Sequence, residues 1–252
     1  MKLHTLKVTS LAALAVAAFT APSTIAALTY TTDDLFLGFR QAGNNSSDFV
    51  VNIGQASIYR DATASFALGQ SGSNLLAALN AAFNNNLSNV TWGVVGTTQN
   101  TASTAPDNLT RLIYTSEPVG STPTASSSQS GPANSIIGFK NYWQTLTEGS
   151  VSNSAVEDAS NASSWNAKMP TSFSSPAVMN VVESGLNTNL DLFRVPQTTA
   201  GQPVTNEGFF SFNLGTGVAT FNVAPVPEPS TMLFGCAMVA AIALNRRRTT
   251  AV

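Results

Sequence analysis

The sequence predicts an α+β fold: an antiparallel β-sheet with a few packed helices, flanked by an N-terminal signal peptide and a C-terminal transmembrane helix. Short runs rich in Phe, Leu and Val, separated by Gly- and Asn-rich turns, predict strands near both ends of a central body. Runs with apolar residues at helical spacing lie between them, which favours an antiparallel sheet. The chain therefore divides into residues 1–26, a body of residues 27–225, and residues 226–248.

The chain begins with the layout of a secretory signal peptide. Lys2 and Lys7 give a positive start, an uncharged Ala- and Leu-rich run covers Val8–Phe19, and small residues follow. Cleavage after Ala26 or Ala27 fits this layout best. The alternative, a buried amphipathic helix, lacks a polar face at helical spacing. The sequence therefore predicts export through the Sec machinery.

The body begins with a predicted hairpin, in which Asp34–Arg40 and Asp48–Ile53 are strands and residues 41–47 form the turn. The clearest helix is Ser73–Phe83, with Ser73 as its N-cap and its leucines and Phe83 on one face. Two further strands are predicted, Val90–Val95 and Leu109–Thr115.

Residues 116–135 are rich in Ser, Thr, Pro and Gly and predict one long surface loop or a boundary between two lobes. A helix over Ile136–Leu146 follows, with Ile136, Phe139 and Trp143 on a common stripe. Residues 151–164 are polar and weakly helical. Three more elements are predicted: a short helix over Pro176–Ser184, a strand over Leu190–Val195, and a hairpin of Phe209–Leu214 with Val218–Val223.

The composition of the body excludes several classes of function. Residues 27–229 carry six basic and 13 acidic side chains, a net charge of −7, which argues against nucleic acid as a partner. The only histidine of the chain is His4 and the only cysteine is Cys236, so both lie outside the body. The body therefore has no disulfide, no Cys/His zinc site and no histidine-based catalytic triad.

Carboxylates are the remaining acid–base groups. A carboxylate-dependent hydrolase would pair, for example, Asp33 or Asp34 with Glu183 or Glu207, but no spacing favours any pair. Calcium would need oxygen ligands, for which three groups were considered: Asp33–Asp34, Asn44–Asn45 with Asp48, and Glu157–Asp158. None follows the spacing of a calcium loop. No catalytic residue, metal site or cofactor is therefore predicted.

The body contains three tryptophans, Trp92, Trp143 and Trp165. A tryptophan ring can stack on a sugar ring, although Trp is also a common core residue. Trp143 fits a helix that docks its aromatic side chains in the core. Trp165 lies between polar residues and is expected to be the most exposed. The candidate glycan contacts are therefore Trp143 and Trp165.

The C-terminal segment combines a proline-bracketed motif, an apolar run and a basic block. The run Thr231–Leu244 has 14 residues, which corresponds to roughly 21 Å of helix. Counting from Val226 brings it closer to the ~20 residues of a membrane span. Arg246, Arg247 and Arg248 follow and would stay on the cytoplasmic side.

Pro227, Glu228 and Pro229, followed by the apolar helix and the arginines, resemble the PEP-CTERM sorting signal of Gram-negative bacteria. The resemblance covers under a tenth of the chain, from Val226 to about Arg248. It implies processing by an exosortase, a membrane-embedded thiol transpeptidase found alongside exopolysaccharide biosynthesis. Pro227, Glu228 and Pro229 would then be substrate residues, and both prolines keep the motif extended.

These observations predict an exported, non-enzymatic protein that the inner membrane anchors transiently before release to the cell surface or extracellular matrix. Its partners would be the Sec machinery, an exosortase and extracellular polysaccharide of a biofilm. The first alternative is a carbohydrate-binding module, and the second is a carboxylate-dependent hydrolase.

Overall fold

The computed structural model describes residues 28–41, 43, 47–98, 108–172 and 183–224. Within them, ten strands form one sheet in which every pair of neighbouring strands is antiparallel. Four α-helices and a short 3-10 helix (Thr198–Ala200) complete the described part. The coarse prediction of an antiparallel sheet with packed helices is confirmed.

The sheet follows the order β3-β10-β9-β8-β5-β4-β1-β2-β6, and β7 pairs with β4 beside this path. The strands are β1 (Asp34–Gln41), β2 (Asp48–Gln55), β3 (Phe66–Ala67), β4 (Val90–Thr97), β5 (Ile113–Pro118), β6 (Ser154–Glu157), β7 (Glu183–Gly185), β8 (Leu190–Val195), β9 (Thr205–Asn213) and β10 (Val218–Val223). The two expected hairpins, β1 with β2 and β9 with β10, are both present.

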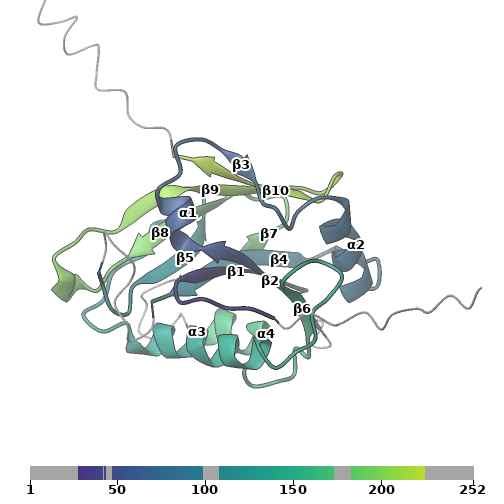
Figure 1. Cartoon of the computed structure of the whole chain (residues 1–252), viewed down its shortest axis with the longest axis horizontal. Helices are drawn as coiled ribbons and strands as arrows, with labels where there is room; N and C mark the ends of the chain where they lie inside the picture. The colour runs from purple at the N-terminus through teal and green to yellow at the C-terminus, as the bar shows by residue number, and fades with distance from the viewer. Residues whose placement is uncertain (1–27, 42, 44–46, 99–107, 173–182, 225–252) are drawn as a thin grey trace, which may run out of the picture.

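Helices cover both faces of the sheet (Figure 1). On one face lie α1 (Ala56–Arg60) and α2 (Ser73–Ala82), which contribute Tyr59, Leu75 and Leu79 to the larger hydrophobic core. On the other face lie α3 (Ser130–Trp143) and α4 (Trp165–Ser172), which contribute to the second core. Because both faces are covered, β1 and β2 are buried along most of their length.

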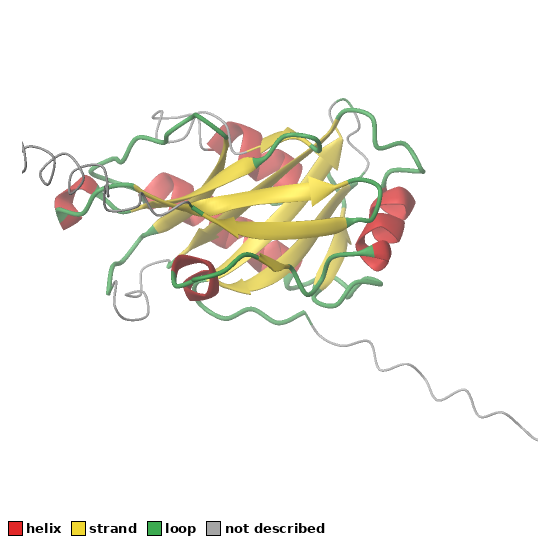
Figure 2. Cartoon of the chain, turned by 90° about the horizontal axis from the view of Figure 1, so that it is seen from above, coloured by secondary structure: helices red, strands yellow, loops and turns green. Residues whose placement is uncertain are grey.

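The sheet curls around the larger core. Phe39 in β1 and Phe212 in β9 are separated by three strands in the sheet order, which would place them about 19 Å apart in a flat sheet. Their ring centroids nevertheless lie 5.9 Å apart. The strands in Figure 2 accordingly fan and bend, with helices both in front of them and behind them.

Several predicted elements differ from the structure. The predicted loop 116–135 is shorter, because β5 runs to Pro118 and α3 begins at Ser130. The weakly helical stretch 151–164 instead contains β6, which pairs with β2. The strand predicted over Leu109–Thr115 corresponds to β5, but its predicted start is wrong, since β5 begins at Ile113.

The helix ends differ as well. Ser73 is the first residue of α2 rather than its cap, and Gly72, with a φ of 109°, occupies the cap position. Most of the helix predicted over Pro176–Ser184 lies outside the described residues, but Glu183 and Ser184 belong to β7. α4 was not predicted, although Ser164 precedes it and accepts a hydrogen bond from the Ala167 N–H as an N-cap.

Both ends of the chain, residues 1–27 and 225–252, lie outside the described part. Among the residues that the structure does describe, no helix has the length and apolar character needed to cross a membrane.

Candidate functional site

The residues predicted for sorting and processing all lie outside the described ranges. These are Ala26, Ala27, Pro227, Glu228, Pro229, Arg246, Arg247 and Arg248. The two predicted glycan contacts, Trp143 and Trp165, lie inside them.

Trp143 and Trp165 are both buried in the second core, with 0% of each side chain exposed. Trp143 meets Phe36 edge-on at 5.0 Å between ring centroids, as expected for a helix that docks its aromatic residues. The expectation that Trp165 is exposed is wrong: Trp165 begins α4, and its ring lies against the backbone of Gly38. Neither tryptophan presents a ring to a glycan in this fold.

Asp34 and Glu183, two of the carboxylates considered for hydrolysis, have different partners at different places on the sheet. Asp34 begins β1 and accepts hydrogen bonds from Asn52 Nδ2 and the Thr31 amide, each at 2.8 Å. Glu183 pairs with Arg40, which lies six residues further along β1, about 20 Å from Asp34. Asp34 therefore fixes local structure, and it is not paired with Glu183.

The structure instead pairs two carboxyls that the sequence placed in separate groups. Asp48 in β2 lies directly opposite Glu157 in β6 in the antiparallel register. Residues opposite each other in such a ladder have Cβ atoms about 5 Å apart. Asp48 is 0% exposed and Glu157 is 1% exposed. We call these two residues the carboxyl pair.

The carboxyl pair binds the first turn of α4. The backbone N–H of Trp165 donates to Glu157 Oε2 at 2.8 Å, and the backbone N–H of Asn166 donates to Asp48 Oδ2 at 2.7 Å. The first N–H groups of a helix have no partner within it, and they carry the positive end of the helix dipole. The carboxyl pair thus ties α4 to the edge of the sheet.

A second, partly buried cluster adjoins this one on β1, β4 and β7. Arg40 Nε donates to Glu183 Oε2 at 2.5 Å, and Thr91 Oγ1 donates to the same oxygen at 3.1 Å. The indole N–H of Trp165 donates to Glu183 Oε1 at 2.5 Å. Trp165 therefore connects Glu183 with the carboxyl pair, through its ring on one side and its backbone on the other.

The electrostatics of the carboxyl pair favour bound protons. Burial raises the pKa of Asp48 to about 7, and the Glu183 charge adds to this effect, while the Asn166 amide and Arg40 oppose it. Burial also raises the pKa of Glu157 well above its usual value, and the Asp48 charge acts in the same direction. Each raised pKa means that ionisation is unfavourable in the folded state.

Burial of the carboxyl pair limits the reactions in which it can take part. A substrate cannot reach carboxyls that are 0% and 1% exposed, so general acid–base catalysis on an external molecule is not supported in this conformation. Nor do the described residues contain a group of three or more acidic, Cys or His side chains arranged to hold a metal ion.

An open groove of about 630 Å³ lies near the opposite edge of the sheet, on the β9–β10 hairpin. Its lining is uncharged and consists of Ser211, Phe212, Asn213, Thr216, Val218 and Thr220. Ser211 and Thr220 are opposite each other in the register and point away from the core that Phe210 and Phe221 fill. Hydroxyl and amide groups here face solvent.

Sequence reasoning missed both the carboxyl pair and this groove. Comparison with known proteins adds no precedent, since no family model, curated protein or solved structure matches the chain.

Proposed function

We propose that this chain is an exported, non-enzymatic protein of the cell surface or extracellular matrix, sorted through Pro227, Glu228 and Pro229 by an exosortase and associated with extracellular polysaccharide. The observation that carries the proposal is the order of parts at the two ends: a signal peptide first, then a Pro-Glu-Pro motif, an apolar run and an arginine block last.

The position of the last strand is consistent with removal of the tail. β10 ends at Val223, so three residues separate the sheet from Pro227. An extended chain of that length spans about 10 Å. Among the residues that the structure describes, all those of the two hydrophobic cores precede Val223, so cleavage at the motif would remove none of these.

The chemistry of the body supports a non-enzymatic role. Residues 27–229 contain neither histidine nor cysteine, the side chains most often used as nucleophile or general base. Asp48 and Glu157, the best-placed pair of acids in the described residues, are shielded from solvent. A role in display and association needs no reactive group.

Cell fractionation of a Glu228→Ala variant in the native host tests the sorting proposal. We expect the variant to keep its tail and to accumulate with the inner membrane, because the motif that the exosortase would read has lost its charge. Asp61→Ala, which removes an exposed acid from the body, is the control and should be processed like the wild type. Normal processing of Glu228→Ala would refute recognition through this motif.

The β9–β10 groove favours a second candidate function, carbohydrate binding, at a place other than the tryptophans. Neutral hydroxyl and amide groups beside apolar surface suit the hydroxyl-rich faces of a sugar chain. Retention on the host polysaccharide would be measured for Ser211→Ala with Thr220→Val, against Ser152→Ala as an exposed control. Retention equal to that of the wild type would eliminate the groove as a sugar site.

A further inference from the structure

The carboxyl pair has a feature that its hydrogen bonds to α4 leave unexplained. Each carboxyl uses one oxygen for a helix amide, Oδ2 in Asp48 and Oε2 in Glu157. The other two oxygens, Asp48 Oδ1 and Glu157 Oε1, are buried and have no hydrogen-bond partner among the described residues. A buried acceptor without a donor is costly, so these two oxygens require an explanation.

The surrounding charges do not supply a counter-ion. Arg40, on β1, is committed to Glu183 on β7, and the two charges largely cancel. On α4, Lys168 has its side chain directed toward Gly138 of α3. Asp158, after β6, is exposed and negative, and its carboxylate is held by Ser160.

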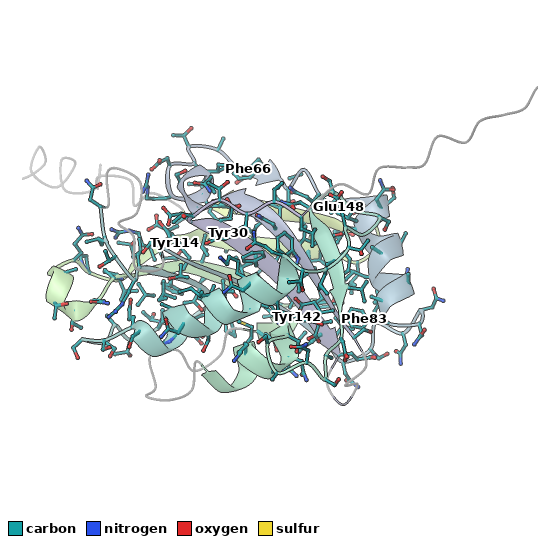
Figure 3. The ribbon with its side chains drawn as sticks, turned by 60° about the horizontal axis from the view of Figure 1, so that its bottom comes forward. Tyr30, Phe66, Phe83, Tyr114, Tyr142 and Glu148 are labelled. Carbon is teal, nitrogen blue, oxygen red and sulfur yellow. The ribbon has the colours of Figure 1, made fainter. Side chains whose placement is uncertain are left out.

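The remaining titratable group is Tyr142, labelled in Figure 3 at the end of α3 near α4. Burial and the negative charges of Glu157, Asp158 and Asp48 raise its pKa, so it is neutral near pH 7. Two ionised carboxylates here would therefore face each other in a dry site with no cation assigned to them.

We propose that Asp48 and Glu157 hold one shared proton between Asp48 Oδ1 and Glu157 Oε1, and that loss of this proton as the pH rises weakens the pairing of β6 with β2. With the proton present, one carboxyl donates to the other, both free oxygens are satisfied, and a single negative charge faces the helix N-terminus. The proton leaves to solvent base, and no other bond is made or broken.

The consequence is a sheet edge that is strengthened by mild acid. β6 is four residues long and pairs only with β2 among the described strands, and its Glu157 would be the site of repulsion. Loss of the proton would weaken this pairing through charge repulsion, whereas the amides of Trp165 and Asn166 favour the ionised carboxyls and would stay bound.

The sign of the pH dependence follows from the direction of the shifts. An acid that titrates at higher pH when folded than when unfolded contributes stability that is complete at low pH and is lost as the pH rises. For one such proton, the equilibrium constant for unfolding rises about tenfold per pH unit between the unfolded and folded pKa. The affected window begins near pH 4 and extends to about pH 7 for Asp48.

Urea unfolding of the full chain in mild detergent, between about pH 5 and pH 8, tests the proposal. We expect the wild-type midpoint to fall as the pH rises to about 7 and to level off above it. In Asp48→Asn, the side-chain amide can donate to Glu157 in place of the shared proton, so the fall should be much smaller. Asp158→Asn removes an exposed carboxylate beside Glu157 and should keep the wild-type slope. A wild-type midpoint independent of pH, or equal slopes in wild type and Asp48→Asn, would overturn the proposal.

Hydrogen exchange in the wild type gives a test that needs no variant. The amides of β6, corrected for their intrinsic rates, should lose protection above about pH 7, while amides in the centre of β4 keep theirs. Equal retention at both places would contradict the weakening of β6. Urea unfolding with added calcium is a further test. If calcium stabilises the wild type at high pH but not Asp48→Asn, the carboxyl pair binds a cation and the proton proposal is wrong.

Discussion

Gly38→Ala is the substitution with the sharpest expected effect on the body. Gly38 is buried in β1, and the indole ring of Trp165 lies directly over its backbone. A Cβ at this position would overlap three ring atoms of Trp165 (Cδ2, Cε2 and Cε3). The strand therefore needs a residue without a side chain here because the tryptophan occupies that space.

The indole ring has little freedom to move away. Phe139 packs against it edge-on, with ring centroids 5.6 Å apart, and its N–H is bound to Glu183. Its own backbone N–H is held by Glu157. Overpacking of a core typically costs about 1–3 kcal/mol. Because the ring is held at several points, we expect a loss of about 3 kcal/mol, or about 6–12 °C in melting temperature for a domain of this size.

Urea titration followed by tryptophan fluorescence would measure this loss. Gly131→Ala is the matched control, because Gly131 lies exposed in α3 with nothing within 4 Å of an added Cβ. That change should be neutral or stabilise the helix by up to about 1 kcal/mol. Gly38→Ala combined with Trp165→Phe should cost less than the sum of the two single changes, since the smaller ring relieves the overlap. A loss below about 0.5 kcal/mol for Gly38→Ala alone would refute the close packing of Trp165 on β1.

Two further predictions concern buried polar contacts. Arg40→Met should lower the free energy of unfolding, measured by urea titration, by about 2–3 kcal/mol. The reason is that the Glu183 side chain, which is 7% exposed, loses its cation. An unchanged midpoint would show that Glu183 does not depend on Arg40. Tyr59→Phe should cost about 1 kcal/mol, because the buried Tyr59 hydroxyl donates to the Ile53 carbonyl at 2.7 Å. Burial raises the pKa of Tyr59, so in an alkaline absorbance titration this residue should ionise only when the protein unfolds; earlier ionisation of all four tyrosines would contradict its burial.

Local sequence signals determined much of the secondary structure. The predicted strands at Asp34–Arg40, Asp48–Ile53 and Leu190–Val195 correspond to β1, β2 and β8, and the predicted hairpins are present. These are apolar runs bounded by turn residues, so propensity and burial act in the same direction. The predicted helix Ser73–Phe83 corresponds to α2 for the same reason.

Prediction from the sequence failed for elements that depend on contacts with residues far away in the chain. β6 has only four residues and is a strand because β2 supplies its hydrogen bonds. α4 contains Pro170 and follows a polar stretch, and its first two amides are satisfied by Asp48 and Glu157, while the preceding Ser164 caps the Ala167 amide. Tertiary contacts override weak local preference in such segments.

The sorting prediction thus rests on the sequence alone, whereas the carboxyl pair of the body depends on the tertiary structure. The prediction of export and sorting rests on the order of charged, apolar and proline residues at the ends, which is a linear property of the chain. The carboxyl pair could be recognised only from the fold. Asp48 and Glu157 lie on separate strands far apart in the sequence, and only the register of β2 with β6 places them opposite each other, with α4 closing the site from water.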